Sequence, residues 1–143
     1  MTKKKILIVE DVKLVAMDIQ ECLQTADYEV VAITVGAKEA LDMVESKHPN
    51  LVIMDIHLGG DMDGAETALV IRSRFGIPVI FLTAFTDKAT LERARLAQPY
   101  GYIVKPFQDR ELLANVEMAL YKHAQETLFL RNGDWLENAL SAF

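Results

Sequence analysis

Polar residues stand wherever an apolar run of this sequence ends. They are Glu10 and Asp11 after residues 6–9, Asp55 after residues 51–54, Thr83 after residues 79–82 and Lys105 after residues 102–104. Three carboxylates that lie close together repel one another, and a hard divalent cation with oxygen ligands relieves that repulsion. We therefore expect the three acidic residues to hold Mg²⁺, with Mn²⁺ as the alternative.

The same residue types suit chemistry on phosphorus. A carboxylate such as Asp55 can attack phosphorus and form an acyl phosphate. Transfer of a phosphoryl group depends mostly on positioning and on stabilising the charge of its outer oxygens. A lysine supplies a compact positive charge and a threonine hydroxyl donates a hydrogen bond, which are the contributions we expect of Lys105 and Thr83.

These residues can act together only if the fold brings the ends of the apolar runs to one place. The runs, at residues 6–9, 30–35, 51–54, 79–82 and 102–104, are continuous, which is typical of parallel strands covered on both faces. The segments between them have helical spacing. Shared helical faces are formed by Val12, Val15, Ala16, Ile19 and Leu23, by Ala37, Ala40, Leu41 and Val44, and by Leu112, Val116, Ala119 and Leu120.

Two further helices are expected at about residues 64–75 and 87–97, the first of them ended by Gly76 and Pro78. Strands that alternate with helices predict an α/β fold with right-handed crossovers. We predict a doubly wound, five-stranded parallel sheet of order 2-1-3-4-5 in a flavodoxin-like three-layer sandwich. In that order the carboxyl ends of strands one, three, four and five surround one crevice.

Composition limits the classes of protein. A chain of 143 residues, 51% of them hydrophobic, fits one soluble globular domain with an extension. The net charge of −6 argues against direct nucleic-acid binding, and no segment predicts membrane insertion. The single cysteine, Cys22, is interpreted as a core residue and suits a reducing compartment, so we expect the cytoplasm.

Five blocks of sequence resemble the signature motifs of response-regulator receiver domains. They are ILIVED at residues 6–11, MDI at 54–56, MDG at 62–64, PVIFLTA at 78–84 and GYIVKPF at 101–107. The resemblance implies a two-component phosphorelay with Asp55 as phosphoacceptor. It also implies metal ligation by Glu10, Asp11, Asp55 and the backbone carbonyl of His57, phosphate binding by Lys105, a switch made by Thr83 and Tyr102, and a cis Lys105–Pro106 peptide.

The family also implies partners. We expect a histidine kinase or phosphotransfer protein as phosphoryl donor, a downstream effector or output domain, and a homodimer through the face of the fourth helix, fifth strand and fifth helix. The chain is expected to be a signalling domain, not an enzyme, beyond assisting its own Mg-dependent phosphoryl transfer and hydrolysis.

The resemblance covers about residues 3–123, so we predict a receiver domain over residues 1–123. Residues 124–143 are predicted to form a C-terminal helical extension or a linker towards an output module. Asn132 and Gly133 predict a turn there, followed by a short helix capped by Asp134 and Glu137. This tail packs on the domain, on a second copy, or on nothing.

One loop departs from the family pattern, and some alternatives stay open. Residues 58–61 place the MDG block one residue further from Asp55 than usual and lack the usual proline, which affects the expected lifetime of the phosphoryl group. The His57 side chain either influences hydrolysis or is a solvated loop residue. A phosphatase would have a second aspartate where His57 stands, and a flavin or dinucleotide protein would have a glycine-rich turn after strand one. An interaction module that has lost phosphorylation is the third class.

Overall fold

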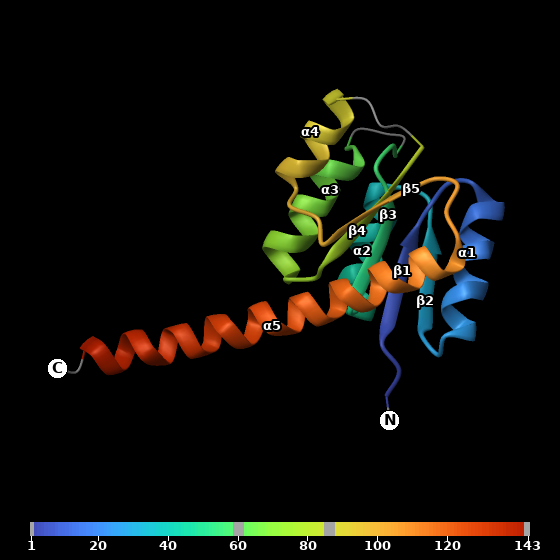
Figure 1. Cartoon of the computed structure of the whole chain (residues 1–143). Helices are drawn as coiled ribbons and strands as arrows, with labels where there is room; N and C mark the ends of the chain where they lie inside the picture. Colours follow the sequence, from blue (N-terminus) through green and yellow to red (C-terminus); the bar gives the residue numbers. More distant parts are fainter. Residues whose placement is uncertain (1, 59–61, 85–87, 142–143) are drawn as a thin grey trace.

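The computed structural model describes residues 2–58, 62–84 and 88–141, with residues 130–141 described by their backbone alone. Five strands alternate with five helices, and a π-helical segment, η1, continues α3 (Figure 1). The elements are β1 (Lys5–Val9), α1 (Lys13–Thr25), β2 (Glu29–Thr34), α2 (Ala37–Lys47), β3 (Leu51–Asp55), α3 (Gly64–Val70), η1 (Ile71–Phe75), β4 (Val79–Thr83), α4 (Lys88–Leu96), β5 (Gly101–Val104) and α5 (Asp109–Ser141).

The strands form one parallel sheet in the order β2-β1-β3-β4-β5, which confirms the predicted fold class. Each predicted strand is present within one residue of its expected bounds. The predicted helix at 64–75 is also confirmed, although its last five residues form the π-helical segment. Of the predicted fourth helix, Asp87 lies outside the described residues.

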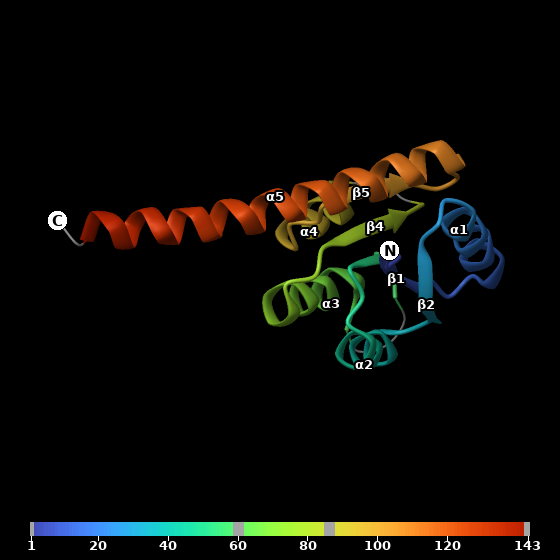
Figure 2. The same cartoon turned by 90° about the horizontal axis from the view of Figure 1, so that it is seen from below.

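Alternate residues of each strand point into two separate cores. Leu7, Val52 and Phe81 pack in the layer that α2, α3 and α4 cover. Ile8 and Ile53, one position along, pack in the layer covered by α1 and α5 (Figure 2). Because both faces are covered, the middle positions of β1, β3 and β4 are apolar on both sides of the sheet, and polar residues stand at the strand ends. Cys22 belongs to the second core, as predicted, and is only 6% exposed.

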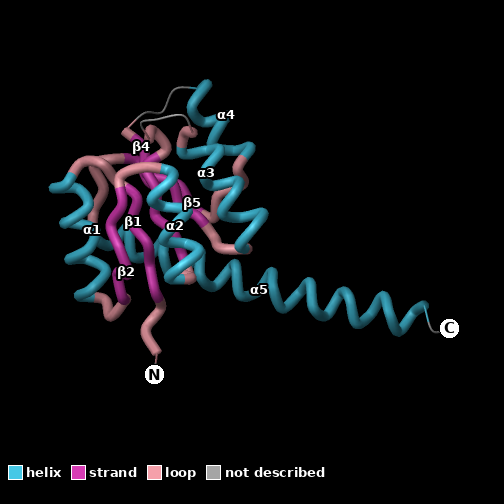
Figure 3. Tube along the Cα trace, turned by 180° about the vertical axis from the view of Figure 1, so that it is seen from behind, coloured by secondary structure: helices cyan, strands magenta, loops and turns pink. Residues whose placement is uncertain are grey.

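The predicted turn at Asn132 and Gly133 is wrong. α5 continues without interruption from Asp109 to Ser141 and also crosses residue 123 without a break (Figure 3). A glycine in a helix interior costs only about 1 kcal/mol relative to alanine, and unbroken helical hydrogen bonding on both sides outweighs that cost. The division of the chain at residue 123 therefore stays a prediction. Within the described part of the chain, no helix is long and apolar enough to cross a membrane.

Gly64, the first residue of α3, controls how closely that helix approaches the end of β3. A Cβ at this position would lie 2.6 Å from the carbonyl oxygen of Ile56 and 2.7 Å from that of Asp55. Both atoms belong to the backbone, so neither can rotate away. The absence of a side chain at Gly64 is therefore what lets α3 begin beside the last residue of β3.

We predict that Gly64→Ala lowers the free energy of unfolding by about 1–3 kcal/mol, because its methyl group overlaps fixed backbone. Urea denaturation of the purified chain measures the change. Gly36→Ala is the control, since a Cβ there meets no atom within 4 Å. Equal losses from the two substitutions would contradict the proposed close approach.

Candidate functional site

The carboxyl edge of the sheet gathers the polar residues that end the strands. Asp55 and Thr83 are the last residues of β3 and β4, and Glu10 directly follows β1. Lys105 follows β5, where its backbone N–H donates to the carbonyl oxygen of Thr83 at 2.7 Å. Parallel pairing of β1, β3, β4 and β5 therefore places residues from distant parts of the chain at one edge.

Lys105 joins two buried carboxylates. Its Nζ donates to Oε1 of Glu10 at 2.6 Å and to Oδ2 of Asp55 at 2.9 Å. Glu10 is 1% exposed and Asp55 is 7% exposed, so most of their contact is with protein instead of water. The Lys105–Pro106 peptide that follows is cis, as the resemblance implied.

Asp11 completes an acidic cluster with Glu10 and Asp55. One carboxylate oxygen from each residue lies within 4.8 Å of the others, and Asp11 is the exposed member. The second oxygen of Glu10, Oε2, is buried and lacks a hydrogen-bond partner among the described residues. A buried carboxylate oxygen without a partner is costly, and a cation bound by this cluster would remove that cost.

The two buried carboxylates hold protons differently. Burial, followed by the neighbouring Asp55, raises the pKa of Glu10 to about 7. Burial also acts to raise the pKa of Asp55, but its neighbours Glu10 and Lys105 and the hydrogen bond from the backbone of His57 lower it below its ordinary value. Hydrogen bonds to both carboxylates raise the pKa of Lys105 against the effect of its own burial. A proton that enters this cluster therefore resides on Glu10, and Asp55 remains ionised.

His57 contributes its backbone to the site. Its N–H donates to Oδ1 of Asp55 at 2.8 Å, while its side chain is exposed. The expected use of its carbonyl oxygen as a metal ligand stays a prediction. Of the unusual loop, residues 59–61 lie outside the described residues.

The predicted switch residues occupy neighbouring strands. Thr83 is fully buried at the end of β4, and Tyr102 of β5 is half-buried. Tyr102 packs against the core layer of α2, α3 and α4, and also lines a hollow of about 450 Å³ beside α4. The two residues lie on adjacent strands and are offset by two positions, because Thr83 pairs with Val104 and Tyr102 pairs with Phe81.

Sequence reasoning missed a second connection between the site and α4. Asp63, the N-cap of α3, accepts a hydrogen bond from the N–H of Glu66 at 2.9 Å and forms an ion pair with Arg93 of α4. Asp63 and Arg93 line a small hollow of about 210 Å³ together with His57 and Thr90. The Asp-Gly pair indicates a helix cap, but no spacing in the sequence singles out Arg93 as its partner.

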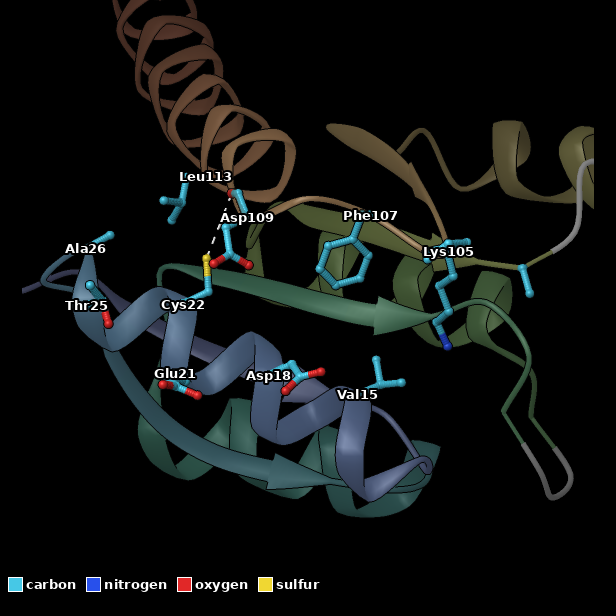
Figure 4. Close-up of a pocket in the computed structure, with 12 residues that line it drawn as sticks. Val15, Asp18, Glu21, Cys22, Thr25, Ala26, Lys105, Phe107, Asp109 and Leu113 are labelled. Atoms are coloured by element: carbon cyan, nitrogen blue, oxygen red, sulfur yellow. Dashed lines mark hydrogen bonds between the residues drawn. The ribbon is translucent and has the colours of Figure 1, made fainter.

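A larger hollow of about 790 Å³ lies between α1 and α5 and reaches Lys105 (Figure 4). Its apolar lining includes Val15, Phe107 and Leu113, and Asp18 and Glu21 add carboxylates from α1. Cys22 also lines it, and its thiol contacts the carbonyl oxygen of Asp109 at 3.8 Å. This hollow therefore gives access to the lysine that joins Glu10 and Asp55.

Comparisons with known proteins agree with this geometry. The family model of the response regulator receiver domain matches residues 6–117. The transcriptional regulatory protein PdtaR of Mycobacterium tuberculosis H37Rv is 36% identical over 124 residues, which make up 87% of this chain and 60% of the relative. This chain therefore spans less than two thirds of that relative's length.

Solved structures agree as well. The receiver domain of a modulated diguanylate cyclase from Desulfovibrio desulfuricans G20 superposes with a TM-score of 0.83 at 33% identity, covering 87% of this chain and 99% of that one. The N-terminal domain of a response regulator/sensory box/GGDEF protein from Carboxydothermus hydrogenoformans has a TM-score of 0.79 at 41% identity, with the same coverage of both chains. Sequence, fold and site geometry together show that this chain belongs to the response regulator receiver domain family.

Proposed function

We propose that Asp55 accepts a phosphoryl group from the phosphohistidine of a histidine kinase or a phosphotransfer protein. The observation that carries this proposal is the Asp55 carboxylate, held by Lys105 at 2.9 Å and by the His57 N–H at 2.8 Å. A carboxylate oxygen of Asp55 forms a bond to phosphorus as the bond from phosphorus to the histidine nitrogen breaks. The departing imidazole keeps that electron pair, and an acyl phosphate remains on Asp55.

Receiver domains generally bind Mg²⁺ at an acidic cluster, and Glu10, Asp11 and Asp55 fit that cation. All three supply oxygen, and the partnerless Oε2 of Glu10 offers a free ligand atom within the described site. The His57 carbonyl is the further protein ligand in this proposal. When bound, Mg²⁺, or Mn²⁺ in its place, neutralises charge on the carboxylates and on the phosphoryl oxygens.

Lys105 and Thr83 then stabilise the phosphorylated state. Lys105 exchanges its contact with Asp55 for one with a phosphoryl oxygen, and the Thr83 hydroxyl donates to another. Movement of Thr83 leaves space at the end of β4 that Tyr102 occupies, which changes the face of α4, β5 and α5. Leu96 and Val104 already expose apolar surface there, at 78% and 37%, as a surface for an effector or an output domain needs. A homodimer through this face stays a prediction.

The phosphoryl donor approaches along α1. Leu14 and Met17 on this helix are 74% and 50% exposed and so offer apolar surface to a partner. The hollow between α1 and α5, which is lined by Val15 and Asp18 of the same helix, reaches Lys105. A helix of the donor that covers Leu14 and Met17 brings its phosphohistidine to the carboxyl edge of the sheet.

We assign residues 1–123 to the receiver and residues 124–143 to a helical extension towards an output module. We also propose that the chain acts in the cytoplasm and that this domain makes no direct contact with nucleic acid. The domain assists hydrolysis of its own acyl phosphate. Whether the exposed His57 imidazole takes part is decided by comparing the phosphoryl lifetime of the native chain with that of His57→Ala.

We expect Asp55→Asn to abolish labelling by radiolabelled acetyl phosphate in the presence of Mg²⁺, because the amide nitrogen and oxygen are poor nucleophiles. Asp42→Asn removes an exposed carboxylate of α2 and should leave labelling unchanged. Circular dichroism checks that both variants fold. Labelling that persists in Asp55→Asn would refute the assignment, and an unlabelled native chain would favour an interaction module that has lost phosphorylation.

Glu10 should make the metal-free domain less stable as pH rises. Its folded pKa of about 7 lies above its ordinary value, so the protonated form favours folding and that advantage is lost as pH rises towards and through 7. At pH 8 in chelator, we expect Glu10→Gln to raise the free energy of unfolding by about 1–2 kcal/mol, and by less at pH 5.

Added Mg²⁺ should reverse this order, because the native chain gains stability from the cation and Glu10→Gln gains much less. Thermal unfolding of the native chain and of Glu10→Gln, at pH 5 and at pH 8 and with either chelator or Mg²⁺, measures the stability under all four conditions. A variant that is no more stable at pH 8 in chelator, or that gains as much from Mg²⁺ as the native chain, would contradict the proposed site.

Thr83→Ala should separate phosphoryl uptake from the switch. We expect it to retain labelling of Asp55 while the NMR resonances of Tyr102 no longer shift when beryllofluoride and Mg²⁺ are added. Thr34→Ala is the matched control, because Thr34 is also a buried threonine that ends a strand, β2, away from β4. The coupling is disproved if Tyr102 responds equally in the native chain and in Thr83→Ala.

A further inference from the structure

One side of α5 packs against the rest of the domain. His123 contacts the carbonyl oxygen of Gly76 through Nε2 at 2.7 Å, and the Tyr100 hydroxyl donates to Glu126. Leu112, Val116 and Ala119 of the same side are fully buried in the core. The C-terminal part of the helix projects away from the sheet and from the other helices (Figures 1 and 2).

The opposite side of α5 is apolar although it faces solvent. Met118 is 64% exposed, Tyr121 63%, Leu128 51% and Phe129 74%. With 3.6 residues per turn, Tyr121 lies roughly 170° and Met118 roughly 130° around the helix from the centre of the buried residues. The domain therefore does not cover this face, and large apolar side chains in line on one helix predict a partner.

The spacing of this face identifies the kind of partner. Tyr121 and Leu128 are seven residues apart, and the sequence continues that spacing to Trp135. Met118, Gln125 and Asn132 form a second series of sevens, offset by three residues from the first. Alternating steps of three and four residues are the a and d positions of a coiled coil, in which a helix packs against another of the same repeat.

We propose that α5 of a second copy of this chain packs along this face as a parallel, two-stranded coiled coil. We call the face formed by Met118, Tyr121, Gln125 and Leu128 the α5 seam. It does not depend on the phosphorylation proposed above. Because the seam lies opposite the core, two domains can flank it without overlap.

Charge favours the parallel direction. Glu117 precedes Lys122 by five residues, and both are exposed. In a parallel coiled coil these are g and e positions, so Glu117 of one copy faces Lys122 of the other. In an antiparallel pair g positions face g positions and e positions face e positions, so this contact between Glu117 and Lys122 would not form. In the single chain the Lys122 ammonium lies 5.7 Å from the centroid of the Tyr100 ring, a contact that it would exchange for Glu117 of the second copy.

The polar a positions predict a weak pair of fixed register. Gln125 and Asn132 interrupt the apolar series, and a polar residue at an a position lowers stability while it specifies register and the number of strands. The projecting half of α5 is also short enough to be only marginally helical alone, so pairing would stabilise it. We therefore expect the dimer to dissociate on dilution.

Sedimentation velocity of the full chain over a range of concentrations, without phosphoryl donor, tests the α5 seam. The native chain should shift from monomer to dimer as concentration rises, and Leu128→Glu should remain monomeric. Leu69→Glu is the matched control, because Leu69 of α3 is also a leucine that is 51% exposed on a helix, but lies off the seam. This control should dimerise as the native chain does.

Leu128→Cys tests the direction of the helices. In a parallel pair the two introduced thiols face each other, so mild oxidation should give a covalent dimer. Leu69→Cys should stay monomeric in denaturing gels, and Cys22 is too buried to interfere. A native chain that is monomeric at every concentration, or a Leu69→Glu variant that dissociates like Leu128→Glu, overturns the seam. A dimer in which Leu128→Cys fails to cross-link overturns the parallel direction.

Discussion

Two buried carboxylates, Glu10 and Asp55, share one lysine at the carboxyl edge of the sheet. Buried charges of like sign repel, and Lys105 neutralises only one of the two. Glu10 therefore takes up a proton readily, and its buried oxygen Oε2 remains without a partner among the described residues. This unbalanced charge makes the edge of the sheet ready for a cation and for a group that carries phosphate.

The rest of the fold holds this arrangement in place. Glu10 and Lys105 are 95 residues apart in sequence, and only the parallel sheet brings them within 2.6 Å. Two apolar layers fix the strands, so the end of each strand cannot retreat from its neighbours. The site is therefore rigid where it holds charge. The site is connected to α4 by the ion pair of Asp63 with Arg93 on one side and by β5 on the other. Through these contacts, a chemical change at the site can alter a binding surface.

Sequence alone could predict the strands, their order and the residues at the carboxyl edge, because buried parallel strands have a distinct pattern and the order determines which ends meet. It could not predict the ion pair of Asp63 with Arg93, since exposed charges on separate helices leave no periodic signal. The Asn-Gly pair at residues 132 and 133 misled the prediction of α5, because local turn preference is weaker than a continuous helix. The pKa difference between Glu10 and Asp55 also required the structure, because it depends on burial and on which donor each oxygen meets.

We propose that the acyl phosphate forms on Asp55 and on no other carboxylate of the cluster. Borohydride reduces an acyl phosphate to an alcohol, so treatment of the phosphorylated chain converts the modified aspartate to homoserine. Peptide mass spectrometry then identifies the converted position among Glu10, Asp11 and Asp55. We expect homoserine at position 55 alone, and only in chains exposed to both phosphoryl donor and Mg²⁺. A reduced residue at position 10 or 11, or none at all, would contradict it.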